Sequence, residues 1–341
     1  MPSIFNNRIR QLILLLIIIL LFILLLKQAY IFLPGFMGAI TLYILLSKWY
    51  FHLTMVNKRS RTGIALIFIF LSLLIIALPV YFSIDLLSNK ISAILNDPVE
   101  LLFNAKLVGQ KIYTLTGYNI FTDENLAAMH YQATKLVPTL INSSASIISN
   151  FAIMFFLLYF MLKNGQDIEI FLRQFIPLEE ENVELLAAET RNMIKANAIG
   201  IPILACLQGI VAIIGYWIFG IKDFVLWGFI TGVFSLVPIV GTASIWVPMV
   251  LYLFALNKNI QATGLLIYSA VLITNIDYVA RLTLLKRFMN IHPLITVFGV
   301  IIGLGLFGFW GVIFGPLLIS YFIILVKIYI KEFGNEDPSS N

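Results

Sequence analysis

The stretch FVLWGFITGVFSLVPIVGTASIWVPMVLYLFAL, from Phe224 to Leu256, decides the fold of this chain. It is apolar enough to lie in a bilayer, but Pro238 and Gly241 interrupt it near its middle. The apolar arms, 224–237 and 244–256, are each shorter than the roughly 20 residues that a helix needs to cross about 30 Å of hydrocarbon. Irregular backbone at membrane depth survives only where protein buries it or water fills a cavity beside it. The stretch therefore predicts a re-entrant helical hairpin, a feature typical of transport pathways.

Composition indicates the class of protein. The 341 residues are 60% hydrophobic and 11% charged, with a mean hydropathy of +0.98, which excludes a water-soluble globule. Apolar runs with the length of a membrane helix recur along the chain. The sequence therefore predicts an all-α integral membrane protein whose principal partner is the lipid bilayer.

Cysteine, histidine and charge exclude other classes. The single cysteine, Cys206, lies in an apolar segment, and the three histidines, His52, His130 and His292, are far apart in the sequence. Neither a disulfide framework nor a metal or other cofactor is expected. The net charge of +5 is assigned to lysine and arginine on cytoplasmic loops, so no nucleic-acid partner is expected.

The apolar runs outside the hairpin predict eight membrane spans. The first run resembles a signal peptide, but no small-x-small cleavage site precedes Lys27, so we interpret it as a retained helix that forms a hairpin with the second run. The runs are Leu12–Leu26, Ala29–Leu46, Gly63–Leu87, Ser146–Leu162, Asn197–Phe219, Gln261–Tyr278, Pro293–Leu306 and Phe309–Val326.

Three regions follow from these spans. Residues 1–87 are expected to hold three transmembrane helices, 88–145 an extracytoplasmic segment of amphipathic helices, and 146–341 the transport core. Within the core, 163–195 carries seven acids and four bases, and Glu179–Glu181 are expected in the first turn of a helix. We interpret this segment as a solvated cytoplasmic helix, with an acidic patch that recruits cations as the alternative.

The distribution of basic residues orients the chain. If the hairpin 224–256 enters from outside, fifteen lysines and arginines lie on the cytoplasmic side and seven outside. Four of those seven fall in the long segment 88–145, where charge has little influence on orientation. If the hairpin crossed the membrane instead, the bases that follow it would change sides. The expected topology therefore places both termini in the cytoplasm.

Asp277 is an acid near the cytoplasmic end of a span, and Arg281 follows one helical turn later on the same face. Low-dielectric surroundings disfavour the charged form of such a carboxyl and a neighbouring guanidinium favours it, so the group could load and release a proton or a cation. The alternative is a structural ion pair at the helix end. Asn275, two residues before the acid, could contribute to the same site or bond a neighbouring helix.

Other candidates lie on the predicted solute path or between helices. Pro238 and Gly241 could line the path with backbone carbonyls and amides, or form a simple turn. Gln208 is a lone polar residue in an apolar span, and it could line the path or bond a neighbouring helix. Glycines at four-residue spacing near the C-terminus favour close helix packing, with a moving hinge as the alternative. The C-terminal candidates are Gly303, Gly308, Gly311, Gly315 and Pro316.

The sequence contains no G-x-S-x-G elbow, no H-E-x-x-H pair and no Walker loop. Intramembrane proteolysis and ATP-driven pumping therefore have no candidate site, no catalytic residue is assigned, and the protein is not expected to be an enzyme. Uphill transport would need an ion gradient or a partner protein.

A series of short motifs resembles the autoinducer-2 exporter family of bacterial transporters. The resemblance covers about Met154 to Tyr329, in the order and at the spacing expected of the family. Its motifs are YFMLK at Tyr159–Lys163, Pro177, Gln208-Gly209, SLVPIVG at Ser235–Gly241, Ile276-Asp277 with Arg281, His292-Pro293-Leu294, Gly308–Gly311 and Gly315-Pro316. Tyr278 and Leu282 stand where many members have Asn and Pro.

The resemblance implies a multi-pass transporter of the bacterial cytoplasmic membrane that forms homo-oligomers. Some members of the family are associated with export of the signalling furanone autoinducer-2, and others with exchange of sodium or lithium for protons. Three hypotheses follow: a secondary exporter of a small polar solute or signalling molecule, with Asp277 as the coupling group; a monovalent-cation/proton antiporter that uses the same carboxyl; and a membrane scaffold that transports nothing and binds partners through its polar segments.

Overall fold

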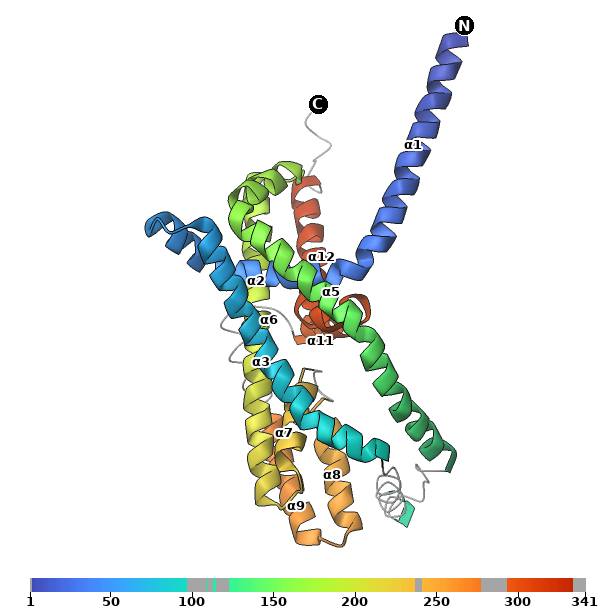
Figure 1. The fold of residues 1–341 in the computed structure, drawn as a ribbon, viewed down its shortest axis with the longest axis vertical. Coiled ribbons are helices and arrows are strands. Elements are labelled where there is room, and N and C mark those ends of the chain that lie inside the picture. The colour runs from blue at the N-terminus through green and yellow to red at the C-terminus, as the bar shows by residue number, and fades with distance from the viewer. Residues whose placement is uncertain are drawn as a thin grey trace, which may run out of the picture.

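The computed structural model of the chain describes residues 2–96, 109, 113–114, 123–236, 241–276 and 293–333. Every regular element within these ranges is helical (Figure 1), as the sequence predicts. Six of the described helical segments are long and apolar enough to cross a membrane. They are Ile9–Val56, Arg61–Leu86, Ser146–Phe175, Glu180–Ile218, Asn259–Ile276 and Gly311–Ile330. The prediction of an all-α membrane protein is confirmed.

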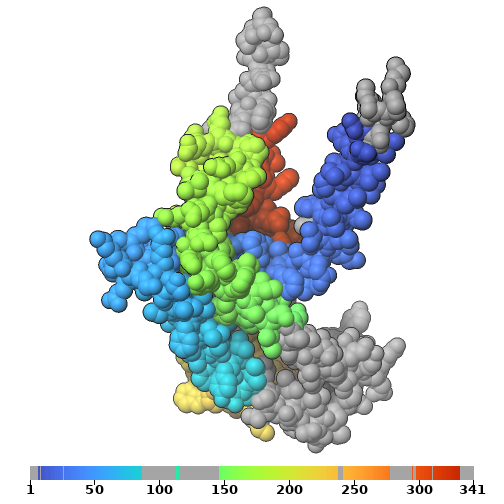
Figure 2. All heavy atoms as spheres, turned by 45° about the horizontal axis from the view of Figure 1, so that its top comes forward, coloured from blue at the N-terminus to red at the C-terminus, as the bar shows by residue number. Residues whose placement is uncertain are grey.

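The first two apolar runs do not form the predicted hairpin. α1 (Pro2–Ala29) continues through the 3-10 turn η1 (Tyr30–Phe32) into α2 (Leu33–Phe51), and α1 stands apart from the other helices (Figure 1, Figure 2). Pro34 explains this path, because it lies in the first turn of α2, where a helix needs no N–H. The proline therefore bends the helical path without reversing it, and the two expected spans merge into one continuous apolar segment.

Asn150 supports the bend at η1 from the neighbouring helix α5 (Asp123–Phe175). Its Oδ1 accepts a hydrogen bond from the Gly35 N–H at 2.9 Å, and its Nδ2 donates to the carbonyls of Ile31 at 3.2 Å and Ser146 at 3.0 Å. One side chain thus satisfies backbone groups of both helices in a region where lipid offers no hydrogen bonds.

Several of the expected segments are parts of longer helices. α3 (Arg61–Asn96) and α5 extend past the predicted spans into the region 88–145. α6 (Glu180–Ile218) joins the acidic region to the fifth predicted span in one helix of 39 residues. Glu180 and Glu181 lie in its first turn as expected, whereas Glu179 is the N-cap residue just before it. Near the start of the acidic region, Asn164 interrupts α5 with non-helical angles, φ −115° and ψ 18°.

The predicted half-length helices of 224–256 are present. α7 (Phe224–Phe234) and α8 (Ala243–Ala255) have 11 and 13 residues, and they gather with α9 (Asn259–Tyr268) around the second half of α6 (Figure 1). The residues between them that include Pro238 lie outside the described ranges. Entry of this pair into the membrane from outside stays a prediction.

The C-terminal glycines form a close helix pair. α11 (Pro293–Phe307) turns at η4 (Gly308–Trp310), where Gly308 has a left-handed φ of 57°, and α12 (Gly311–Phe333) returns along it. A Cβ on Gly299 would lie 2.5 Å from Pro316 Cα, so the backbones touch. α11 matches the predicted run Pro293–Leu306 and extends it by one residue, but its 15 residues are fewer than the roughly 20 that a membrane span needs. It is therefore not among the six long segments, which is the second difference from the eight predicted spans.

Replacing Gly303 by Ala tests this contact. The new Cβ would overlap the Gly311 carbonyl and lie 2.7 Å from Gly315 Cα. We expect Gly303→Ala to lower the free energy of unfolding by about 1–3 kcal/mol, measured by denaturation in mixed detergent micelles. Gly305→Ala on the same helix is the matched control, because nothing lies within 4 Å of its Cβ position. Equal stability of the two variants would contradict the proposed packing.

Candidate transport site

Gln208 is the most unusual polar residue in the described membrane helices. It lies on α6, its side chain is 0% exposed, and neither its amide oxygen nor its amide nitrogen has a hydrogen-bond partner among the described residues. An unpartnered buried amide costs about 1–3 kcal/mol, so native proteins retain such groups only where water, a solute or a functional requirement accounts for them.

α7 packs against α6 through glycines, which have no side chain that could form a hydrogen bond. Gly228 and Gly232 of α7 face α6, and a Cβ on Gly232 would lie 2.5 Å from the carbonyl oxygen of Ala205 and 3.1 Å from Gly209 Cα. The two helices therefore meet backbone to backbone beside Gln208. A glycine face supplies no side-chain donor or acceptor to the part of α6 that flanks Gln208.

Two more unpartnered polar atoms belong to helices packed around the same half of α6. Ser269 Oγ, on the π-helix η3 (Ser269–Ile273), is fully buried, and the indole Nε1 of Trp246, on α8, is buried as an atom. Trp246 packs against a hydrophobic cluster that includes Ala212 of α6 and Ile273 of η3. These donors and acceptors are electrically neutral and sit within an apolar environment.

Neighbouring polar residues do find partners, so the unpaired atoms are not a general property of the region. Tyr216 and Thr231 are fully buried and bond each other through their hydroxyls at 2.9 Å. The Tyr268 hydroxyl donates to the carbonyl of Val211 at 2.9 Å, one helical turn from Gln208. The contrast indicates that Gln208 and Ser269 are available to a bound molecule or to water.

The helix that leads to Asp277 is locally widened. η3 has the π-helical pattern, which occurs mostly as single turns inside α-helices and is frequent at functional sites. Within and after it, the Thr274 hydroxyl donates to the Ser269 carbonyl at 3.2 Å, and Asn275 Nδ2 donates to the Val271 carbonyl at 2.7 Å. Asn275 is exposed and its amide nitrogen is used by its own helix, so its contribution to a solute site stays a prediction.

The other candidate residues lie in different places. Asp277, Arg281 and Pro238 fall outside the described residues, whereas Gly241 is buried just before α8. Gly303, Gly311, Gly315 and Pro316 form the close contact of α11 with α12, and Gly308 forms the turn between these helices. This pair packs against α6 in a hydrophobic cluster around Met193 and Ile194.

Several residues of the site were not singled out from the sequence. The four-residue spacing of Gly228 and Gly232 is a signal that could have identified the α6 contact. Ser269 is a polar residue within an apolar run, which is the same signal that singled out Gln208. No sequence pattern distinguishes Trp246 from an ordinary apolar tryptophan.

The described helices define a multi-pass helical membrane protein with interrupted helices and unpaired neutral polar groups inside the membrane domain. A family profile described as AI-2E family transporter matches residues 12–331, and the chain belongs to this family.

Curated relatives agree with this assignment. The chain is 31% identical over 175 residues to a "Putative transport protein" of Aquifex aeolicus, and the match covers 51% of this chain and 50% of the relative. Proteins with the same description from Helicobacter pylori and Treponema pallidum are 28% identical over 194 residues and 29% over 177 residues. These two matches cover 54% and 51% of this chain, and 55% and 43% of the relatives. The chain thus matches about half the length of these relatives, which together with the family supports a membrane transporter.

Replacing Gln208 by Leu tests whether its amide is unpaired. Because the substitution removes a desolvated polar group and keeps the volume similar, we expect Gln208→Leu to leave the free energy of unfolding unchanged or raise it by about 1 kcal/mol. Asn197→Leu, also on α6, should lower it by about 1–2 kcal/mol, because the buried Asn197 amide donates to the Ile313 carbonyl at 3.1 Å. Chemical denaturation in micelles measures both, and equal destabilisation would show that the Gln208 amide is bonded.

Proposed function

We propose that this protein is a secondary transporter that exports a small polar solute or signalling molecule, such as an autoinducer-2-like compound, across the bacterial cytoplasmic membrane. One observation carries the proposal: the fully buried Gln208 amide, unpartnered among the described residues, beside the glycine contact of α6 with α7. An amide presents both donors and an acceptor, and together with the Ser269 hydroxyl it could replace the hydration shell of a neutral hydroxylated solute.

Asp277 is proposed as the group that couples transport to an ion gradient. In the sequence it comes four residues after the end of η3, the π-helix whose Ser269 hydroxyl is unpartnered among the described residues. A carboxyl near a low-dielectric path changes its protonation as its surroundings change, and Arg281 one turn later would set the balance between its two forms. Pro238 and Gly241 are proposed to line the same path with backbone groups.

Exchange of Na⁺ or Li⁺ for H⁺ is the second candidate function. The oxygen atoms proposed for the site favour this exchange, because hard cations prefer oxygen ligands. These oxygens belong to the amide of Gln208, the hydroxyl of Ser269 and the carboxylate of Asp277. Both functions require the acid, whereas a scaffold that transports nothing does not.

The proposal also covers the membrane topology and the oligomeric state of the protein. We place both termini in the cytoplasm and expect the protein to form homo-oligomers. α1 supports an assembly within lipid, because its apolar side chains are exposed on all sides, with Leu14 62% and Leu25 69% exposed. Such a helix can face lipid or a second copy of the chain, but it cannot face water.

Proteoliposomes loaded with a pH gradient test the proposed coupling. We expect Asp277→Asn to reduce solute-driven or cation-driven dissipation of the gradient at least tenfold, while the protein remains folded. Glu181→Gln, which removes an exposed acid from the first turn of α6, is the control and should transport like the wild type. Dissipation by Na⁺ or Li⁺ alone would favour antiport, and full activity of Asp277→Asn would contradict both transport proposals.

A further inference from the structure

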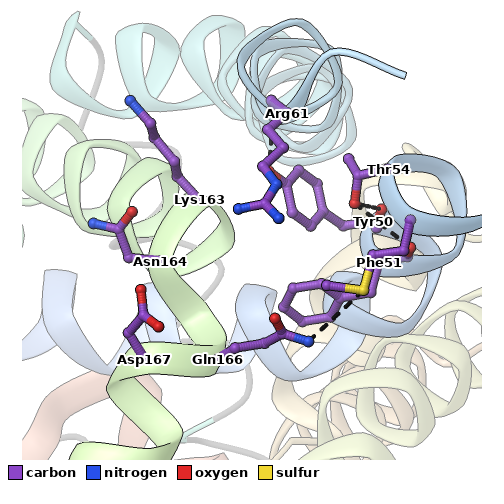
Figure 3. Close-up of a pocket in the computed structure, with 9 residues that line it drawn as sticks. Tyr50, Phe51, Thr54, Arg61, Lys163, Asn164, Gln166 and Asp167 are labelled. Atoms are coloured by element: carbon purple, nitrogen blue, oxygen red, sulfur yellow. Dashed lines mark hydrogen bonds between the residues drawn. The ribbon is translucent and has the colours of Figure 1, made fainter. Parts of the chain in front are cut away.

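A polar pocket that is not lined by Gln208 lies where α2, α3 and α5 meet (Figure 3). It is formed by the end of α2 with the π-helix η2 (His52–Val56), the start of α3, and α5 around its kink at Asn164. Its volume of about 40 Å³ is enough for roughly three water molecules. No step of the proposed transport mechanism uses this pocket.

The pocket lies at the level where the membrane changes from apolar to polar. The apolar run of α3 begins just after Arg61, and that of α5 ends at Leu162, just before Lys163. Trp49, next to the pocket residue Tyr50, is 68% exposed, as is typical of tryptophan in the head-group layer. The segments of α3 and α5 that line the pocket therefore lie at the boundary between the apolar and the polar parts of these helices.

Arg61, Lys163 and Asp167 line the pocket with charges of both signs. Figure 3 shows the Arg61 guanidinium directed toward the stretch of α5 that carries Lys163 and Asn164. Arg61 and Asp167 form no ion pair with each other, and the ion pair that the described residues do form, Arg173 with Glu184 at 3.9 Å, lies elsewhere. The Lys163 ammonium lies 5.7 Å from the centre of the Tyr159 ring, and the charges of Arg61 and Asp167 are left available to a ligand.

We propose that this pocket binds the head group of a phospholipid that carries a primary ammonium, phosphatidylethanolamine. Arg61 binds the phosphate through its planar guanidinium, Lys163 adds a second positive charge, and Asp167 accepts hydrogen bonds from the lipid ammonium. The start of α3 at Arg61 directs the positive end of a helix toward the phosphate. The acyl chains would lie along the lipid-facing side of α3, where Leu66 and Phe70 are 55% and 62% exposed.

Asp167 distinguishes this ligand from others. A purely anionic head group would be repelled by the carboxylate, and the quaternary ammonium of phosphatidylcholine cannot donate a hydrogen bond to it. A dissolved phosphate would use only the basic part of the pocket. The position of the pocket at the edge of the apolar helices favours the lipid, because the bilayer presents head groups there at high local concentration.

Native mass spectrometry of the full-length protein, with lipids of matched acyl chains added to the micelles, tests the proposal. We expect phosphatidylethanolamine to bind about tenfold more tightly than phosphatidylcholine, a difference of about 1.4 kcal/mol. Arg61→Gln should weaken binding of phosphatidylethanolamine about tenfold, and Asp167→Asn should abolish its advantage over phosphatidylcholine. Arg59→Gln is the matched control, because Arg59 is exposed and does not line the pocket.

Three results would overturn the proposal. Equal lipid binding by Arg61→Gln and Arg59→Gln would remove Arg61 from the site. Tighter binding of phosphatidylglycerol than of phosphatidylethanolamine would assign the pocket to anionic lipid. Displacement of the lipid by excess inorganic phosphate would assign it to a dissolved anion. Since Arg61 and Asp167 are exposed, the melting temperatures of the variants should stay at the wild-type value, which separates loss of lipid from loss of fold.

Discussion

The structure depends on one constraint: lipid offers no hydrogen bonds, so every break in a membrane helix must be satisfied by the protein itself. Asn150 satisfies the backbone at the bend between α1 and α2, and the amide of Asn197 bonds the Ile313 carbonyl between α6 and α12. Both are single polar side chains within apolar helices, and both join elements that are distant in the sequence. The helices can therefore bend and pack without leaving backbone groups exposed to hydrocarbon.

Glycines allow pairs of helices to pack closely. Gly228 and Gly232 bring α7 against α6, and Gly299 and Gly303 bring α11 against α12. Between α11 and α12 the result is a compact hairpin. At α6 the same kind of contact involves Ala205 and Gly209, which lie on either side of Gln208 in the sequence. The buried Gln208 amide has no partner among the described residues, and the proposed transport function rests on it.

Much of the fold follows from local patterns in the sequence. The short helices α7 and α8 were predictable, because proline and glycine divide an apolar run into halves too short to cross a membrane. The continuous path of α1 into α2 was not predictable, since Pro34 is compatible both with a turn and with the first residues of a helix. Gln208 was recognisable as a candidate from its isolation among apolar residues. Its lack of a hydrogen-bond partner was not predictable, because a missing partner depends on how all the neighbouring helices pack in three dimensions.

Water access to position 208 tests the central claim most directly. In a Cys206→Ser background, which removes the one native cysteine, Gln208→Cys can be treated with a membrane-impermeant thiol reagent in sealed vesicles. Ala212→Cys, one turn along α6 and 0% exposed within a hydrophobic cluster, is the comparison. If a polar path passes Gln208, the cysteine at 208 reacts and the one at 212 does not. If neither reacts from either side of the membrane, no solute path passes this residue.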